Sequence, residues 1–286
     1  MSAVLGAARP RPFALLRRAC LAGLPLVLCG CVAPDSQVPP FARVPYEPIS
    51  REAIAEIALR EWRLFGSRMD DAPEPTVGGV SQKPERAEGL WQRVGEYWWI
   101  GLDHGSVESK WTGKHDETGA VFSPDRDGEY PWSAAFVSYV FRIAGAGRRF
   151  PYAPDHAHYI DIARHEALHA TGAWLITAER PEEYAPRIGD LICQGRNEAI
   201  NLRFNDLPVG HYFPAHCDVV VDTSLPEELS VIGGNENDAV TMKHVSATSD
   251  GKIAASEVHH WLVVLRLNGV PDKDPGDQPY LPVPPP

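Results

Sequence analysis

The chain has 286 residues, which is enough for one substantial domain or two small ones. Hydrophobic residues make up 44% of it and charged residues 23%, values that are ordinary for a soluble globular protein. The formal net charge of -11 argues against a surface that binds nucleic acid or anionic membrane, because both surfaces require clustered Lys and Arg, and no nucleic-acid partner is expected.

The N-terminal segment has the features of a secretory signal. Basic residues precede a short apolar run at residues 19–28, which is too short to span a bilayer. The run ends in Leu-Cys-Gly-Cys, which resembles a bacterial lipobox. This pattern predicts a lipoprotein signal peptide over residues 1–30 and a lipid anchor on Cys31 as the contact with the membrane. Val32 favours the periplasmic face of the outer membrane; the alternatives are an ordinary secretory signal or a single-pass anchor.

A proline-rich stretch and two helical segments follow. Residues 31–46 lack periodicity and are rich in proline, which is typical of a tether between a membrane and a folded domain. Apolar residues at helical spacing predict a helix at 50–65, with Ser50 as its N-cap, and a second helix at 86–99. A loop rich in glycine, aspartate, serine and proline is expected at 103–129.

The segment from Ser133 to Gly145 predicts a buried helix. Almost all of its residues are apolar or small, and a helix that is apolar on every side is buried on every side. Ser133 lies in the first turn, directly after Pro131 and Trp132, so this helix can direct one polar side chain toward a cleft. Another helix is expected at 155–170.

The second half of the chain changes to short β-branched runs that are separated by turn signals and predict strands. These runs lie at residues 190–194, 217–223, 228–234, 240–245 and 260–267. Helices first and strands later, without alternation, predict an α+β fold in which N-terminal helices pack on a small antiparallel sheet. We expect one domain over residues 47–268 and a disordered, proline-rich tail over 269–286.

Two cysteines remain after Cys31. Cys193 and Cys217 lie in predicted strands, and an oxidising periplasm permits a disulfide bond between them. Two buried free thiols are the alternative. Successive strand residues point to opposite faces of a sheet, so the side chains of His216 and Cys217 are expected to point in opposite directions.

Four pieces of the chain resemble a known group of enzymes. The sequence PWSAAFV is similar to the Pro-Trp-Cys motif of papain-like peptidoglycan amidases and endopeptidases, the CHAP and NlpC domains, with Ser133 in place of the catalytic cysteine. Residues 187–194, 215–222 and 231–238 resemble later strands of that core, in the same order. Over residues 86–267 the chain is also similar to a bacterial envelope lipoprotein family of unknown function built on this core.

The resemblance implies a papain-like core and a catalytic group. Ser133 takes the place of the nucleophile, His216 that of the base, and Asn235 that of the residue that orients the base, with Glu236 as a possible substitute. The implied activity is hydrolysis or acyl transfer at amide or ester bonds of peptidoglycan or its peptides. The implied partner is therefore peptidoglycan or another envelope peptide, and neither a cofactor nor a metal is required.

A serine at this position has to work differently from a cysteine. The dipole at a helix N-terminus is worth about 0.3–1 kcal/mol, which shifts a pKa by less than roughly one unit. Such a shift helps a thiol to ionise, but a serine hydroxyl is a far weaker acid, so the imidazole must take its proton during attack. If Ser133 is only an N-cap, the domain is a catalytically inactive one that binds envelope peptide or glycan, or that scaffolds other proteins.

Three further residues are candidates for the substrate cleft. Trp132 precedes Ser133, His156 follows the nucleophile helix, and Glu236 lies beside Asn235. The tryptophans of the first half of the chain could stack on sugar rings, although aromatic residues at helical spacing more often belong to the core.

Residues His165 to His169 match the HExxH signature of zinc hydrolases. In that signature two histidines one helical turn apart bind zinc and a glutamate, here Glu166, activates water. The context does not favour this hypothesis, because the charged Arg164 precedes the motif and no Gly-x-x-His follows it. A solvated helix face with two histidines is the alternative.

Overall fold

The structure is a computed structural model that describes residues 49–71, 83–256 and 260–272. The expected signal peptide at 1–30, the lipidation site Cys31, the tether at 31–46 and residues 273–286 of the expected tail lie outside the described residues. Among the helices of the described ranges, none is long and apolar enough to cross a membrane.

The α-helices occur where the sequence predicts them. They are α2 (Arg51–Leu64), α3 (Leu90–Gly101), α4 (Ser133–Ile143) and α5 (His156–His169). Ser50 caps α2, because its Oγ accepts a hydrogen bond from the backbone N–H of Ala53 at 3.0 Å. α3 begins four residues later than expected, since the residues Pro84–Arg86 form a separate 3-10 turn.

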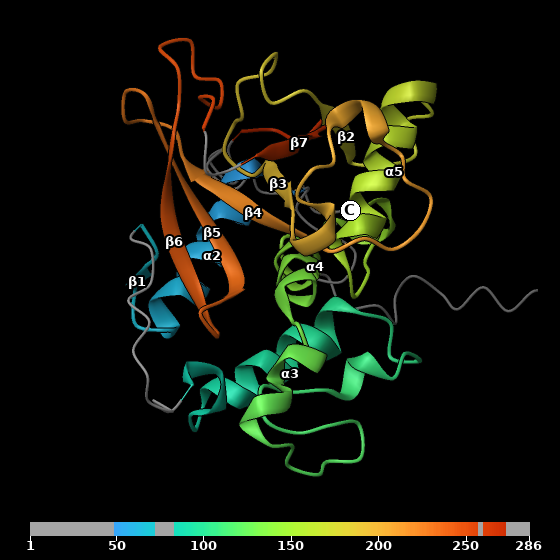
Figure 1. Ribbon diagram of the computed structural model, residues 1–286, viewed down its shortest axis with the longest axis vertical. Coiled ribbons are helices and arrows are strands. Elements are labelled where there is room, and N and C mark those ends of the chain that lie inside the picture. Colours follow the sequence, from blue (N-terminus) through green and yellow to red (C-terminus); the bar gives the residue numbers. More distant parts are fainter. Residues whose placement is uncertain (1–48, 72–82, 257–259, 273–286) are drawn as a thin grey trace, which may run out of the picture. The chain divides into compact units, whose positions relative to one another are not determined.

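A seven-stranded sheet follows, in the order β1-β6-β5-β4-β3-β7-β2 (Figure 1). Its strands are β1 (Arg68–Met69), β2 (Ile176–Glu179), β3 (Leu191–Gly195), β4 (Ala215–Asp222), β5 (Glu228–Glu236), β6 (Ala239–Ser246) and β7 (Trp261–Leu267). The five predicted strands are confirmed, whereas β1 and β2 were not predicted because they are too short to show a pattern. The sheet is not purely antiparallel as expected, since β1 pairs with β6 in parallel. The α+β class is confirmed.

α4 is the central helix of the fold. It packs against β4 and β5 on one side, and α3 packs on it in turn (Figure 1). Eight of its eleven residues are buried, which confirms the prediction from its apolar sequence. α3 comes very close at Gly101, where an added Cβ would lie 2.7 Å from the carbonyl oxygen of Ala135. β5 comes equally close at Gly234, where a Cβ would lie 2.6 Å from the Cβ of Phe136.

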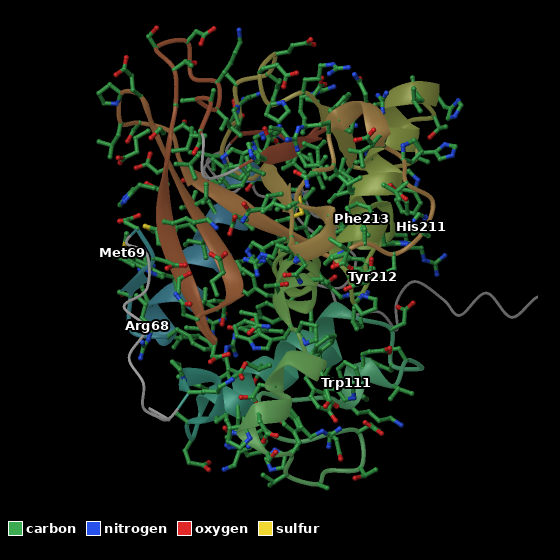
Figure 2. The ribbon with its side chains drawn as sticks, in the orientation of Figure 1. Arg68, Met69, Trp111, His211, Tyr212 and Phe213 are labelled. Carbon is green, nitrogen blue, oxygen red and sulfur yellow. A yellow bond between two sulfur atoms is a disulfide. The ribbon has the colours of Figure 1, made fainter. Side chains whose placement is uncertain are left out.

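A disulfide bond joins Cys193 and Cys217, with an S–S distance of 2.06 Å (Figure 2). The two residues are opposite each other in the antiparallel pair of β3 and β4, and both are fully buried. Of the two alternatives that the sequence leaves open, the structure contains the disulfide. Such bonds are typical of proteins that fold outside the reducing cytoplasm, so the domain is extracytoplasmic.

The first residues of the expected tail are attached to the domain. The backbone carbonyl groups of Pro271 and Asp272 accept hydrogen bonds from the N–H groups of Arg51 and Glu52 at the start of α2. The guanidinium of Arg51 is itself buried and lies 2.7 Å from the carboxylate of Asp190. The described part of the expected tail is therefore hydrogen-bonded to the start of α2.

Candidate active site

The hydroxyl of Ser133 lies at the N-terminus of α4. Trp132 is the N-cap and Ser133 is the first helical residue, and no side-chain hydrogen bond caps this helix. The Oγ of Ser133 instead forms a hydrogen bond of 2.8 Å with Nε2 of His156. The serine is partly exposed, whereas His156 is only 3% exposed. Ser133 is therefore not a helix cap, and its hydroxyl is directed at an imidazole.

His156 is held in place by the start of α5. Asp155 caps this helix, since its carboxylate accepts a hydrogen bond of 2.9 Å from the backbone N–H of His158, and His156 is the first helical residue. Its ring packs edge-on against the ring of Tyr159, with centroids 5.7 Å apart. Within the described residues its Nδ1 has no hydrogen-bond partner. Burial and ring packing therefore orient this imidazole, in place of a carboxylate.

The surroundings of His156 keep its ring neutral. Burial lowers the pKa of His156 well below the ordinary value of 6.5, and the positive charges that His216 and Arg196 can carry lower it further. A neutral imidazole has a free lone pair and can accept a proton from a hydroxyl group. The pair of Ser133 and His156 therefore has the protonation states that a nucleophile and its base require.

The structure gives His216 a different place from the one that the sequence implies. Its ring lies next to that of His156, with centroids 5.4 Å apart, and its Nε2 points to the carboxylates of Asp218 at 3.1 Å and Glu236 at 3.3 Å. Ser133 therefore has His156, and not His216, as its hydrogen-bond partner. The reason is the face of the sheet to which the side chain of His216 points.

Adjacent glycines of β5 show that α4 and His216 lie on opposite faces of the sheet. A Cβ on Gly234 would lie against Phe136 of α4, whereas a Cβ on Gly233 would lie 2.8 Å from Nε2 of His216 and 2.3 Å from Oδ1 of Asp218. Successive residues of a strand point to opposite faces. His216, at the start of β4, thus contacts the ring of His156, and His156 occupies the position beside Ser133.

Two cations balance the two carboxylates around His216. The ammonium of Lys243 lies 3.0 Å from both Asp218 and Glu236, and the guanidinium of Arg196 lies 2.7 Å from Glu236. Burial opposes ionisation of Asp218, but the charges of Lys243 and His216 outweigh it and lower the pKa of this carboxyl. Burial likewise opposes the charge of Lys243, but Asp218 and Glu236 raise its pKa. Asp218 and Lys243 thus favour the charged state in each other.

A β-bulge determines whether the side chain of Asn235 or that of Glu236 faces His216. Alternation from Gly233 would direct Asn235 toward His216, but the register of β5 and β6 shifts between Gly234 and Glu236. Asn235 has a positive φ of 58° at this shift. The extra residue turns Glu236 toward His216 in place of Asn235. The polar neighbours of His216 are therefore Glu236, the substitute that the sequence suggests, and Asp218, which sequence reasoning missed.

Trp132 does not line a cleft as expected. It is 1% exposed, and its Nε1–H donates a hydrogen bond of 2.5 Å to Glu85. Burial raises the pKa of Glu85 to about 8, although this hydrogen bond acts in the opposite direction. Trp132 therefore anchors the start of α4 beneath Ser133. Its position directly before the serine gave no signal of this role, because the partner is 47 residues away.

The HExxH segment is helical, but its glutamate has another function. Glu166 accepts hydrogen bonds from Thr171 Oγ1 and from the backbone N–H of Gly172 at 2.6 Å, which fastens the end of α5. His165 and His169 are exposed and lie side by side, with ring centroids 4.7 Å apart. The glutamate that should activate water is thus occupied, and the segment is the solvated helix face that the alternative predicts.

In the described part of the chain, one group of three side chains has donor atoms close enough to hold a metal ion: His216, Asp218 and Glu236. Their donor atoms all lie within 4.8 Å of one another. The ammonium of Lys243 already lies between the two carboxylates, and a divalent cation there would meet its repulsion. This donor set does not fit a metal, so the zinc hypothesis gains no support from either group.

Comparisons with known proteins place the site in a family. A protein-family model described as "Uncharacterized protein conserved in bacteria (DUF2272)" matches residues 85–267. The match includes Ser133, His156 and the strands around His216. No curated protein and no solved structure matches the chain.

Proposed function

The chain thus belongs to the DUF2272 family, and we propose that it is a serine hydrolase or acyltransferase of the cell envelope. Its substrates would be amide or ester bonds of peptidoglycan or its peptides. The observation that carries the proposal is the 2.8 Å hydrogen bond between a partly exposed hydroxyl at a helix N-terminus and a buried imidazole. The disulfide favours an envelope location. The motif around Ser133 favours peptidoglycan, and a lipid on Cys31 would hold the enzyme at the periplasmic face of the outer membrane.

The first step is attack by Ser133. Its O–H donates to the unprotonated Nε2 of His156, and as Oγ bonds to the carbonyl carbon of the substrate, the proton passes to the imidazole. The carbonyl oxygen becomes an oxyanion. The first backbone N–H groups of α4 have no acceptor within the helix, and they can stabilise that negative charge together with the helix dipole.

The second step breaks the bond. The imidazolium of His156 returns its proton to the leaving amine or alcohol, which departs and leaves an acyl group on Ser133. A water molecule then bonds to the acyl carbon and loses a proton to His156. The bond between that carbon and Oγ breaks, His156 returns the proton to Oγ of Ser133, and the acid is released; an amine can take the acyl group in the same way. In this scheme His156 is the base, and His216, with Asp218 and Glu236, forms a polar support behind it.

Digestion of purified peptidoglycan tests the proposal. The wild-type protein should release soluble products with new amino or hydroxyl ends, as measured by chromatography with mass spectrometry, and Ser133→Ala should release none. Ser224→Ala, at an exposed serine outside the site, is the matched control and should behave as wild type. Release that persists in Ser133→Ala, or no release by the wild type, would contradict the proposal and favour an inactive, envelope-binding domain.

A further inference from the structure

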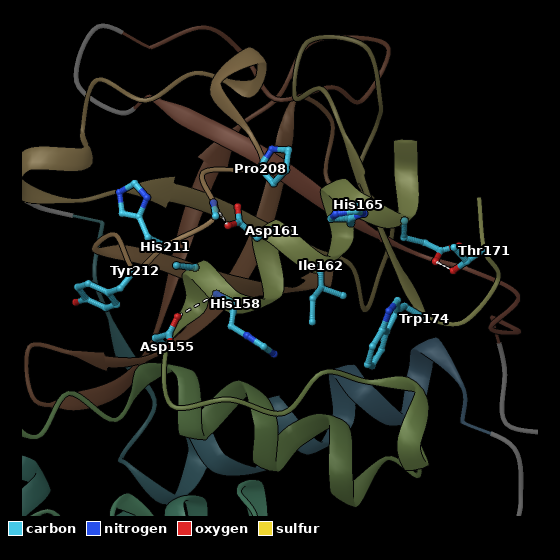
Figure 3. Close-up of a pocket in the computed structure, with 13 residues that line it drawn as sticks. Asp155, His158, Asp161, Ile162, His165, Thr171, Trp174, Pro208, His211 and Tyr212 are labelled. Atoms are coloured by element: carbon cyan, nitrogen blue, oxygen red, sulfur yellow. Dashed lines mark hydrogen bonds between the residues drawn. The ribbon is translucent and has the colours of Figure 1, made fainter. Parts of the chain in front are cut away.

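A pocket of about 520 Å³ lies along α5 (Figure 3). Small-molecule sites typically have volumes of roughly 300–1,000 Å³. Helix α5 forms one wall, and the segments around Trp174 and around Tyr212 form the others. In Figure 3 the side chains of His158, Ile162 and Trp174 all point to the same side of α5.

The walls of the pocket are fixed to α5 by hydrogen bonds. The carboxylate of Asp161 accepts from the backbone N–H groups of Val209 at 2.8 Å and Gly210 at 2.6 Å. Glu166 holds the opposite segment through Thr171 and Gly172. Two side chains of one helix thus position both neighbouring segments.

The lining of the pocket favours an uncharged, polar ligand with a flat apolar face. Trp174 and Tyr212 supply aromatic surface, and Tyr212 is 68% exposed. His158, His165 and His211 supply groups that can donate or accept hydrogen bonds. Among the described residues that line the pocket there are three carboxylates, Asp155, Asp161 and Glu166, and neither Lys nor Arg, which disfavours an anionic ligand such as a phosphate.

The pocket adjoins the proposed base. Asp155 and Ala157, the two neighbours of His156 in the chain, both line it, while the ring of His156 itself turns to Ser133. The pocket therefore reaches the start of the helix that carries the proposed base. A second part of the same polymer is the simplest occupant of such a position.

We propose that this pocket binds sugar rings of the glycan strand of the polymer whose amide or ester bonds Ser133 attacks. The identity of the polymer rests on the proposed function, whereas the preference for a neutral saccharide rests on the lining. Successive sugar rings offer apolar faces to Trp174 and Tyr212, which lie at opposite ends of the pocket in Figure 3, and hydroxyl or acetamido groups to the histidines. Of the tryptophans in the first half of the chain that could stack on sugar rings, Trp98 and Trp132 are buried in the core and cannot contact a ligand.

Calorimetric titration with a soluble β-1,4-linked tetramer of N-acetylglucosamine tests this inference. The purified protein should bind the tetramer saturably, and Trp174→Ala and Tyr212→Ala should each weaken binding at least about tenfold, or about 1.4 kcal/mol. Tyr212 is largely exposed, so its substitution should not disturb folding. Trp99→Ala removes an exposed tryptophan of α3 that does not line the pocket, and it should bind like the wild type.

The same titration with Ser133→Ala separates the two proposals. Binding that persists in this variant supports the pocket even if no bond is hydrolysed, and a wild type that hydrolyses peptidoglycan without binding the tetramer overturns the pocket alone. Equal binding by Trp174→Ala, Tyr212→Ala and Trp99→Ala would also overturn it. A stem peptide without sugar that competes for the pocket would show that the ligand is peptide.

Discussion

The chemistry of this site begins with two side chains that are ordinary by themselves. A serine hydroxyl is a poor nucleophile, and a solvated histidine is partly protonated near neutral pH. The position of His156 changes this, because burial keeps its ring neutral while its Nε2 lies 2.8 Å from Oγ of Ser133. Ser133 itself stays partly exposed.

The pKa of His156 makes a prediction about pH. Since the reactive form is neutral, modification of Ser133 by a fluorophosphonate should stop as His156 is protonated, and the lowered pKa puts this below the ordinary value of 6.5. The rate should therefore stay level as the pH falls from about 8 to 6.5 and decline only in more acidic buffer. A midpoint at or above 6.5 would mean that His156 is not a buried, neutral base.

The ion pairs around His216 make a prediction about stability. Lys243→Met removes the cation that Asp218 and Glu236 share and leaves buried carboxylates less well paired, which should cost about 3 kcal/mol in urea unfolding at neutral pH. Lys252→Met is the matched control, because Lys252 pairs with the exposed Asp250 at the surface. It should unfold like the wild type, and an equal loss in both variants would contradict the structural role of the buried cluster.

At the scale of elements, the sheet and α4 approach each other through glycines. The pair Gly233 and Gly234 makes room for polar groups on one face of β5 and for α4 on the other. The sequence shows both glycines, but a strand pattern alone cannot show which face of the sheet each glycine leaves open. It also cannot show the bulge after Gly234, which places the side chain of Glu236, and not that of Asn235, beside His216.

Substitution of Gly233 tests this close approach. In Gly233→Ala the new methyl group would meet the carboxylate of Asp218 and the ring of His216, which should reduce the free energy of unfolding by about 1–3 kcal/mol. Labelling of Ser133 should slow as well, because His216 supports His156. Gly105→Ala, with open space around it, is the control for the backbone effect of alanine. Equal stability of the two variants would show that β5 can adapt.

The sequence predicts well those elements whose signal is local. The apolar run after Ser133, the capping serine before α2 and the five β-branched runs each carry enough pattern to define an element. β1 and β2 are held by pairing with β6 and β7, and that pairing depends on residues far away in the chain. Their short segments therefore give no signal.

At the scale of the whole molecule, the candidate site joins residues that no local pattern connects. Ser133 and His156 meet because α5 begins next to the start of α4, and His216 comes from a strand 60 residues further along the chain. The resemblance to papain-like enzymes led to Ser133 and to the strand of His216. It did not indicate His156 as the partner, since that choice depends on the sheet face on which His216 lies.

The central claim is that His156 activates Ser133, and the mass of the intact protein after fluorophosphonate treatment tests it most directly. We predict one adduct on the wild type, located at Ser133 by peptide mapping. We also predict labelling at least about 100-fold slower in His156→Ala and unchanged in the matched control His169→Ala, at an exposed histidine. An adduct on another residue, or equal rates in His156→Ala and the wild type, would contradict the account.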